Sequence, residues 1–261
     1  MLRSPTVLIT AGVAVVAVLA LAFVLVQNVV NGSSGPIVAP AETLPLSLAH
    51  GRSIGNPNAP IKLDEWADFQ CSVCDDYSLT VEPDLMRQYV ATGQVQITYH
   101  DMLIIGPASL TAAVAARCAG EQGQFWPYHD YLFANQGPEN GGRFNRALYD
   151  AIAAKLNLNQ SAFDQCLANP AIAQAAEAET TQGEQLGIAG TPTIFMNGKL
   201  LYGSLVGPSG SPAAQSSVAL TVPSFSAAID AELRALASAA PSSATPSASS
   251  SPGPSVSSSA P

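Results

Sequence analysis

Two cysteines three residues apart, Cys71 and Cys74, stand where a predicted strand ends and a predicted helix begins. Residues 61–66 have the apolar character of a strand, and a helical pattern runs from near Cys71 towards Val90, with Pro83 expected to kink it. Residues i and i+3 lie on one face of a helix, so the two sulfur atoms come within bonding distance. The helix N-terminus stabilises a thiolate, which makes Cys71 the candidate nucleophile and Cys74 the resolving thiol.

A zinc site and a purely structural disulfide are the two alternatives for this pair. Zinc needs four ligands, and one C-x-x-C motif supplies only two. No second such motif exists, and the other cysteines and the histidines lack ligand spacing: Cys118, Cys166, His50, His100 and His129. A disulfide that closes so short a loop adds little stability in the chain-entropy model. We therefore expect a redox-active pair that works without a metal or a cofactor.

The N-terminal part of the chain predicts a membrane anchor. No charged side chain lies between Arg3 and Glu42, and residues 7–30 are apolar over more than the roughly 20 residues that cross a bilayer. A cleaved signal peptide, the alternative, has a shorter apolar core and a better cleavage site than this segment offers. With Arg3 as the flanking cation, residues 1–6 are predicted to be cytoplasmic and the rest of this single-pass cell-membrane protein to lie outside. Disulfides form and persist in such a compartment.

Composition divides the rest of the chain into three parts. Residues 31–47 have the composition of a linker, residues 48–238 form the folded domain, and the Pro/Ser/Ala tail at residues 239–261 is expected to be disordered. The chain contains 48% hydrophobic and only 11% charged residues, with a formal net charge of -9. That balance argues against binding of nucleic acid, whose phosphates need a basic face.

Within the folded part, strand and helix patterns alternate. Residues 94–100 alternate in polarity and are rich in β-branched side chains, as in a second strand, and a long helical region follows. Two apolar strands flank Asn197-Gly198, the dipeptide that a tight hairpin turn prefers. A last helix aligns four apolar side chains at helical spacing: Phe225, Ile229, Leu233 and Leu236. This order fits a small mixed sheet covered by helices and interrupted by a helical insertion.

The remaining two cysteines lie on apolar faces of predicted helices. Cys118 continues the face of Leu110 and Val114, and Cys166 stands beside Phe163. In an oxidising compartment we favour a structural disulfide between Cys118 and Cys166 over two free buried thiols.

Three segments together carry a family resemblance: DEWADFQCSVC, QGQFWPYHDYLF and GIAGTPTIFMNGK. In this order and spacing they resemble the DsbA-like branch of the thioredoxin superfamily, in its membrane-anchored or exported bacterial form. The resemblance implies an α/β thioredoxin fold with an inserted helical domain at about residues 105–186, here preceded by one N-terminal transmembrane helix. We interpret Trp126, Tyr128 and His129 in the second segment as core packing. The stretch between Gly203 and Val222 is longer than the family usually has.

The resemblance also implies roles for individual residues. Cys71 and Cys74 correspond to the redox pair, and Thr191-Pro192 to a cis-proline turn that faces Cys71 and binds an extended substrate. Glu65 corresponds to a buried acid that takes the proton of the second thiol, although the adjacent Asp64 leaves open which of the two carboxylates points inward.

The expected activity is that of an extracytoplasmic thiol-disulfide oxidoreductase which introduces disulfides into exported client proteins. By resemblance, a quinone-linked membrane partner of the DsbB or vitamin K epoxide reductase type would reoxidise it. Two alternatives stay open: a thiol reductase fed by a membrane electron donor, and a non-catalytic adaptor with a thioredoxin fold. Between the cysteines, Ser72 offers a hydroxyl and Val73 only its backbone N–H, without the histidine that further stabilises the thiolate in the resembled family.

Overall fold

The computed structural model describes residues 36–41, 46–207 and 209–239. The predicted membrane anchor at residues 7–30 and its cytoplasmic flank lie outside the described residues, as do part of the linker and the tail from residue 240 onwards. Within the described ranges, no helix combines the length and the apolar character that crossing a membrane requires.

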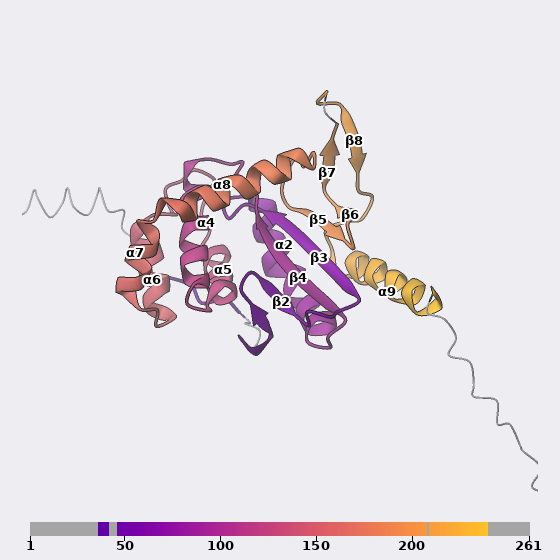
Figure 1. Cartoon of the computed structure of the whole chain (residues 1–261), viewed down its shortest axis with the longest axis horizontal. Helices are drawn as coiled ribbons and strands as arrows, with labels where there is room; N and C mark the ends of the chain where they lie inside the picture. Colours follow the sequence, from indigo (N-terminus) through magenta and orange to yellow (C-terminus); the bar gives the residue numbers. More distant parts are fainter. Residues whose placement is uncertain (1–35, 42–45, 208, 240–261) are drawn as a thin grey trace, which may run out of the picture.

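A six-stranded sheet forms the centre of the fold, in the order β1-β2-β4-β3-β5-β6 (Figure 1). Its strands are β1 (Ala49–His50), β2 (Ser53–Gly55), β3 (Ile61–Ala67), β4 (Val95–Asp101), β5 (Thr193–Met196) and β6 (Lys199–Tyr202). The central strands β3 and β4 are parallel, and every other neighbouring pair is antiparallel. The strands predicted at residues 61–66 and 94–100 are confirmed to within one residue. The short strands β1 and β2, which precede them after a 3-10 turn η1 (Leu46–Leu48), were not predicted.

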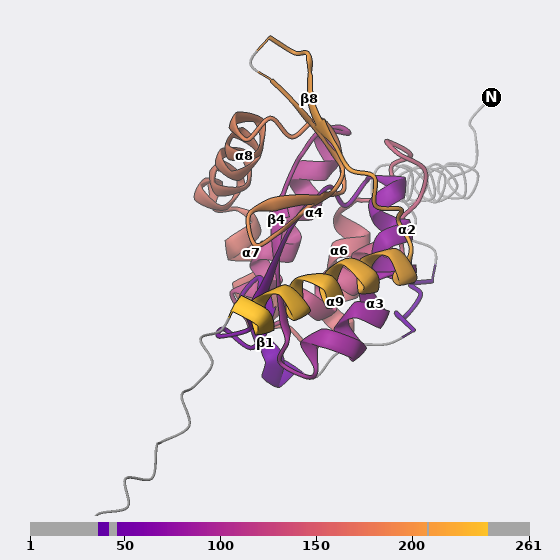
Figure 2. The same cartoon turned by 90° about the vertical axis from the view of Figure 1, so that its right-hand side faces the viewer.

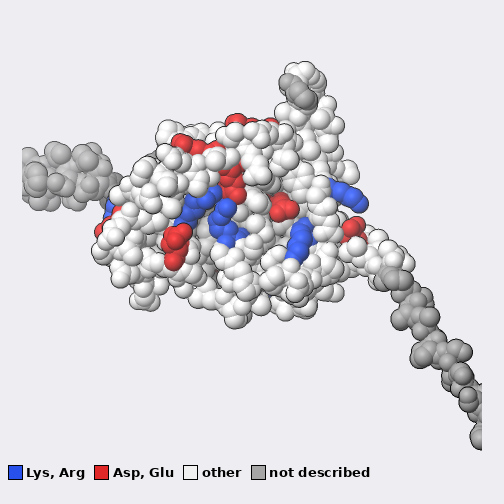
Figure 3. Space-filling view, in the orientation of Figure 1, with Lys and Arg blue, Asp and Glu red and all other residues white. Residues whose placement is uncertain are grey.

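The two faces of the sheet differ in polarity. Odd-numbered residues of β3, such as Leu63, are buried, while Lys62 and Asp64 on the other face are partly exposed. Figure 3 shows charged side chains of both signs over that second side of the molecule. The alternation of the sequence thus directs one face of the sheet towards the core.

Helices from both ends of the domain cover the buried face of the sheet (Figure 2). They are α2 (Ser72–Thr80), α3 (Glu82–Leu85), the π-helical turn η2 (Met86–Val90) and α9 (Val222–Ala239). The kinked helix predicted up to Val90 is confirmed in its course, and the interruption falls at Val81, two residues before Pro83, which stands in the first turn of α3. Proline is tolerated there because the first N–H groups of a helix have no partner within it.

Helix α9 is anchored by its N-terminal half. Phe225 and Ile229 are fully buried, whereas Leu236, predicted on the same apolar face, is 38% exposed. The last turns of α9 extend beyond the sheet, where no strand remains to cover them (Figure 1).

A helical insertion follows β4 and occupies one end of the sheet, where the sequence predicted it. Its helices are α4 (Pro107–Gly120), α5 (Phe125–Ala134), α6 (Arg146–Lys155), α7 (Gln160–Leu167) and α8 (Pro170–Gln185). Asn145, Asn159 and Asn169 begin α6, α7 and α8, and each side chain accepts a hydrogen bond from a backbone N–H in the first turn. A disulfide joins Cys118 of α4 to Cys166 of α7, 48 residues apart, as the sequence favoured.

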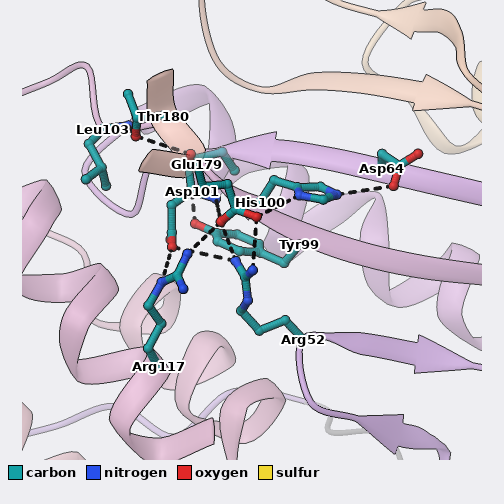
Figure 4. A network of polar contacts seen from close by, with 10 residues as sticks. Arg52, Asp64, Tyr99, His100, Asp101, Leu103, Arg117, Glu179 and Thr180 are labelled. Atoms are coloured by element: carbon teal, nitrogen blue, oxygen red, sulfur yellow. Dashed lines mark hydrogen bonds and ion pairs between the residues drawn. The ribbon is translucent and has the colours of Figure 1, made fainter. Parts of the chain in front are cut away.

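An ion-pair network fastens the insertion to the sheet (Figure 4). The Glu179 carboxylate of α8 accepts hydrogen bonds from Arg52 at 2.5 and 2.9 Å and from Arg117 of α4 at 2.7 Å. Arg117 also donates to Asp101 of β4 at 2.6 Å, and His100 lies 2.9 Å from Glu179. Burial alone would raise the pKa of Glu179, but the bonds from His100 and Arg52 lower it to about 2. The charges are therefore paired where the two parts of the fold meet.

Helix α8 also packs closely on the sheet through a glycine. A Cβ atom on Gly183 would lie 2.7 Å from the Met102 sulfur and 2.9 Å from ring atoms of Trp66. Only glycine allows this approach without a shift of its neighbours.

A second, two-stranded sheet projects from the domain between β6 and α9 (Figures 1 and 2). It consists of β7 (Ser204–Val206) and β8 (Pro212–Gln215), which pair antiparallel. It lies in the Gly, Ser and Pro-rich stretch that is longer than the resembled family usually has, and residues 203–221 contain no charged side chain.

Candidate active site

The cysteine pair lies at the C-terminal end of β3, where the chain turns into α2. Cys71 is the N-cap residue of α2, and its sulfur lies beside the N–H groups of Val73 and Cys74 in the first turn. Cys74 lies one turn further into the helix. Both are free thiols, and Cys71 is 5% exposed while Cys74 is completely buried. An incoming sulfur atom therefore meets Cys71 first.

A cis-proline turn faces the pair. The bond Thr191–Pro192 is cis, as the resemblance implied. The Cys71 thiol donates a hydrogen bond to the Thr191 carbonyl oxygen at 3.3 Å. Residues from two distant parts of the sequence thus form one site.

The two thiols differ strongly in acidity. The hydrogen bond from the Cys74 thiol, together with smaller contributions from Thr191 and from the N–H groups of Cys74 and Val73, outweighs burial and lowers the pKa of Cys71 to about 6. Burial raises the pKa of Cys74 well above its usual value, and a negative charge on Cys71 raises it further. At neutral pH the reduced pair holds a thiolate at Cys71 and a thiol at Cys74.

Ser72 lies between the two cysteines and could have assisted the thiolate, but its polar groups bind another residue. The Ser72 hydroxyl and backbone N–H both point to the Glu139 carboxylate, at 3.2 and 3.3 Å. The hydroxyl considered from the sequence as a contact for Cys71 is therefore occupied. Glu139 also places a negative charge at the N-terminus of α2, where it opposes a second anion.

An open groove lies beside the cysteine pair and includes Val73 and the cis-proline turn in its lining. Its volume is about 460 Å³, and Val73, Pro192 and Tyr202 lie along it together with β7–β8 residues such as Gln215. The side chain of Val73 is exposed beside Cys71. The β7–β8 hairpin, which the sequence marked only as an unusual length of chain, forms one wall of this groove.

Gln136 is a further site residue that the sequence did not indicate. Its amide donates to the carbonyl oxygens of Phe69 at 2.7 Å and of Cys71 at 3.0 Å. It follows α5 of the insertion, so the helical insertion holds the loop that presents the nucleophile. An isolated glutamine in a loop carries no sequence signal for this role.

The structure decides between the two neighbouring carboxylates of β3. Glu65 is fully buried, whereas the Asp64 side chain is 39% exposed and contacts His100 at 3.2 Å on the other face of the sheet. Burial raises the pKa of Glu65 to about 8. Glu65 is therefore the inward-facing acid, and it is protonated over much of the neutral range.

Two more buried polar side chains meet Glu65. One ligand-type atom each of Glu65, Glu82 of α3 and His129 of α5 lie within 4.8 Å of one another. Burial raises the pKa of Glu82 well above its usual value. His129 was predicted to lie in the core, which its burial confirms. Neither this contact nor the part of Glu82 in it was predicted from the sequence. The three side chains could hold either protons or a divalent cation.

Comparison with known proteins agrees with this geometry. A thioredoxin family model matches residues 47–246. Probable disulfide bond formation protein D of Bacillus anthracis is 27% identical over 153 residues, covering 57% of this chain and 70% of the relative. The structure of oxidised BdbD from Bacillus subtilis matches with a TM-score of 0.59 at 18% identity, over 77% of this chain and 100% of that chain. Wolbachia pipientis alpha-DsbA1 matches with a TM-score of 0.57 at 22% identity, over 76% and 96% of the two chains.

The extent of the family match, together with the sheet order and the cysteine pair at the start of α2, places the chain in its class: it belongs to the thioredoxin family. The helical insertion, the cis bond before Pro192 and the named relatives narrow this further. The protein is a DsbA-like thiol-disulfide oxidoreductase.

Proposed function

We propose that the protein is a membrane-tethered oxidase that introduces disulfides into exported proteins outside the cytoplasm. The apolar segment at residues 7–30 supports the tether and the compartment. The names of the relatives, among them a disulfide bond formation protein, support the direction of the reaction. The bonded pair of Cys118 and Cys166 also suits an oxidising compartment.

One observation carries the proposal: the acidity of the two thiols is split. A Cys71 thiolate with a pKa of about 6 is a good leaving group, and its stability favours the reduced pair. An enzyme whose reduced form is stabilised in this way passes its disulfide on to a client. The lowered pKa of Cys71 therefore favours transfer of the disulfide to a client.

The reaction follows from this arrangement. A client thiolate attacks the Cys71 sulfur, the Cys71–Cys74 bond breaks, and Cys74 leaves and takes a proton from Glu65. The second client thiol loses its proton to solvent and attacks the client sulfur of the mixed disulfide, which releases the Cys71 thiolate. Two electrons pass to the cysteine pair. Of the two protons that the client loses, one is matched by the proton that Cys74 gains, and the other stays in solvent.

The groove beside Pro192 would hold the client during these steps. An extended peptide can pair with the backbone of Thr191 as an added strand while its cysteine faces Cys71. For the next cycle the electrons leave to a membrane partner, which we propose to be quinone-linked and of the DsbB or vitamin K epoxide reductase type. No bound cofactor is needed, because the two thiols carry both electrons.

Oxidative refolding of a reduced, disulfide-containing client by the full-length protein tests the proposal. The wild type should accelerate it, and Cys71→Ser should not. Cys74→Ser should instead accumulate mixed disulfides through Cys71 on non-reducing gels, because the thiol that expels the client is gone. Equal adducts from both variants would contradict the assignment of the nucleophile. Rapid insulin reduction without any refolding activity would favour the reductase alternative.

A further inference from the structure

The Glu65, Glu82 and His129 cluster has a composition that ordinary core packing does not explain. All three side chains are at most 2% exposed. Both carboxylate oxygens of Glu65, Oε1 of Glu82 and Nε2 of His129 have no hydrogen-bond partner among the described residues. Buried polar atoms are normally paired, since an unpaired one costs about 1–3 kcal/mol. Two carboxyl groups can bond each other only when one holds a proton, so the cluster is built to hold movable protons.

The proposed reaction requires proton traffic at this point. Cys74 gains a proton when a client is oxidised and loses one when the pair is reoxidised. The resemblance assigns this exchange to Glu65, the buried acid of β3, and Tyr99 faces both Glu65 and Cys74. Glu65 has no exposed surface. It must therefore exchange its proton with solvent through another group in every cycle.

Two side chains connect Glu65 to the surface. Glu82 lines a surface pocket of about 650 Å³ and its Oε2 atom accepts a hydrogen bond from Ser78, another lining residue, at 3.1 Å. His129 Nδ1 lies 2.9 Å from Asp130 Oδ1, and the Asp130 side chain is 21% exposed in the same pocket. When Nδ1–H donates to Asp130, Nε2 is left as a base that faces the two carboxyls.

We propose that Glu82 and His129, with Asp130, relay protons between Glu65 and this surface pocket. The pocket shares no lining residue with the groove beside Pro192. A bound client would therefore leave the proton path open. This inference rests on the proposed function in one respect: the cysteine pair must be reduced and reoxidised in each cycle, whether the protein acts as an oxidase or as a reductase.

The surroundings of the relay favour neutral or shared protons over fixed charges. Tyr77 of α2 faces both carboxyls, and Tyr99 of β4 faces Glu65 and Cys74, and both phenols stay protonated because burial raises their pKa well above its usual value. Asp130 acts on Glu82 as a like charge, while His129 acts as an opposite one. The ring of His129 is enclosed by other rings: Phe69, Tyr99, Phe125, Trp126 and Phe133. This enclosure fixes the direction of Nε2.

Each transfer is balanced and moves no electrons. During client oxidation the Glu65 carboxyl gives its proton to the Cys74 thiolate, and the Glu82 carboxyl then gives its proton to the Glu65 carboxylate. Glu82 regains a proton from solvent in the pocket, directly or through His129 and Asp130. During reoxidation the same proton leaves Cys74 by the reverse order of steps.

The test separates the two thiol steps in Glu82→Gln and His129→Gln. A mixed disulfide between Cys71 and thionitrobenzoate is prepared on the full-length protein, and its resolution by Cys74 is followed against pH. In the wild type the rate should rise through the ionisation of Glu65. In both variants it should fall at least about tenfold and lose this rise, as expected for lost acid–base catalysis. Alkylation of Cys71, which does not use the relay, should keep its wild-type pH profile.

Glu179→Gln is the matched control, since it removes a partly buried carboxylate on the opposite face of the sheet. It should lower stability and leave the pH profile of resolution unchanged, and Glu82→Asp should restore part of the rate. Wild-type profiles in both relay variants would overturn the proposal. So would a stoichiometric divalent metal that survives dialysis against a chelator. An unreactive Cys71 in the wild type would instead remove the proposed function and, with it, the step that the relay serves.

Discussion

Hydrogen bonds outweigh burial in setting the pKa of Cys71, whereas burial dominates the pKa of Cys74 and of Glu65. The pKa of Cys71 is lowered to about 6, that of Glu65 is raised to about 8, and that of Cys74 is raised well above its usual value. An acid whose pKa lies near the working pH both gives and accepts protons readily. The chemistry of the site therefore follows from which polar groups reach each sulfur or carboxyl.

The ionisation of Cys71 predicts a pH-dependent stability of the reduced protein. Its pKa is about 6 in the folded state against 9.0 for an ordinary thiol. The resulting stabilisation is full above about pH 9, falls with pH and is lost below about pH 6. In denaturant titrations, the free energy of unfolding of the reduced form relative to the oxidised form should rise by about 1.4 kcal/mol per pH unit between these limits.

Cys71→Ser is the control for this measurement. It lacks the thiolate and cannot form the disulfide, so the free energy of unfolding of the reduced wild type should rise relative to it by the same amount per pH unit. A difference between the reduced and oxidised wild type that stays constant from pH 6 to 8 would contradict a stabilised Cys71 thiolate.

Single residues differ in how far their roles could be read from the sequence. Cys71 and Cys74 were found from their spacing at a helix start, and Pro192 from the family segment that contains it. The acid was narrowed to Asp64 or Glu65, and only the strand's orientation decided it. Glu82 and Gln136 gave no signal, because their roles arise from contacts between segments far apart in the chain. His129 was correctly expected in the core, but burial alone does not reveal which atoms it meets.

At the scale of elements, the junction between the insertion and the sheet depends on Glu179. Its carboxylate, 11% exposed, pairs with Arg52 and Arg117, and removing one member of a buried charge network leaves the others unpaired. Glu179→Gln should therefore lower the free energy of unfolding by about 3 kcal/mol at neutral pH, measured by urea denaturation.

Glu177→Gln is its matched control, being an exposed carboxylate in the same helix α8. It should change stability by no more than about 0.5 kcal/mol. Equal effects of the two substitutions would mean that the network of Figure 4 does not stabilise the junction.

Elements with a strong local pattern were predictable, and those defined by tertiary pairing were not. Strands β3 and β4 alternate along their length, and the hairpin turn uses Asn197 and Gly198, both with positive φ. Strands β1 and β2 are two and three residues long, too short for a pattern, and they exist because β4 offers an edge. Strands β7 and β8 likewise form by pairing with each other within a stretch of turn-forming residues.

At the scale of the whole molecule, separate surfaces serve separate tasks. The groove beside Pro192 faces the proposed client, the pocket beside Glu82 faces solvent on its own set of residues, and the charged network joins the insertion to the sheet. The fold could be predicted from three sequence segments because their order and spacing resemble those of the DsbA-like branch of the thioredoxin superfamily. The anchor and the tail are expectations from composition, and they lie outside the described residues.

The reduction potential of the Cys71–Cys74 pair, from equilibration with glutathione buffers, tests the central claim most directly. DsbA, with a cysteine pKa near 3.5, has a potential of about -120 mV, and thioredoxin, with a pKa near 7, one of about -270 mV. This range corresponds to roughly 7 kcal/mol, since about 30 mV equals 1.4 kcal/mol for a two-electron couple. The compartment and the fold favour an oxidase, so we predict a potential between the two and closer to that of DsbA, although the Cys71 pKa of about 6 taken alone lies nearer to that of thioredoxin. A value at or below that of thioredoxin would contradict the oxidase and establish the reductase in its place.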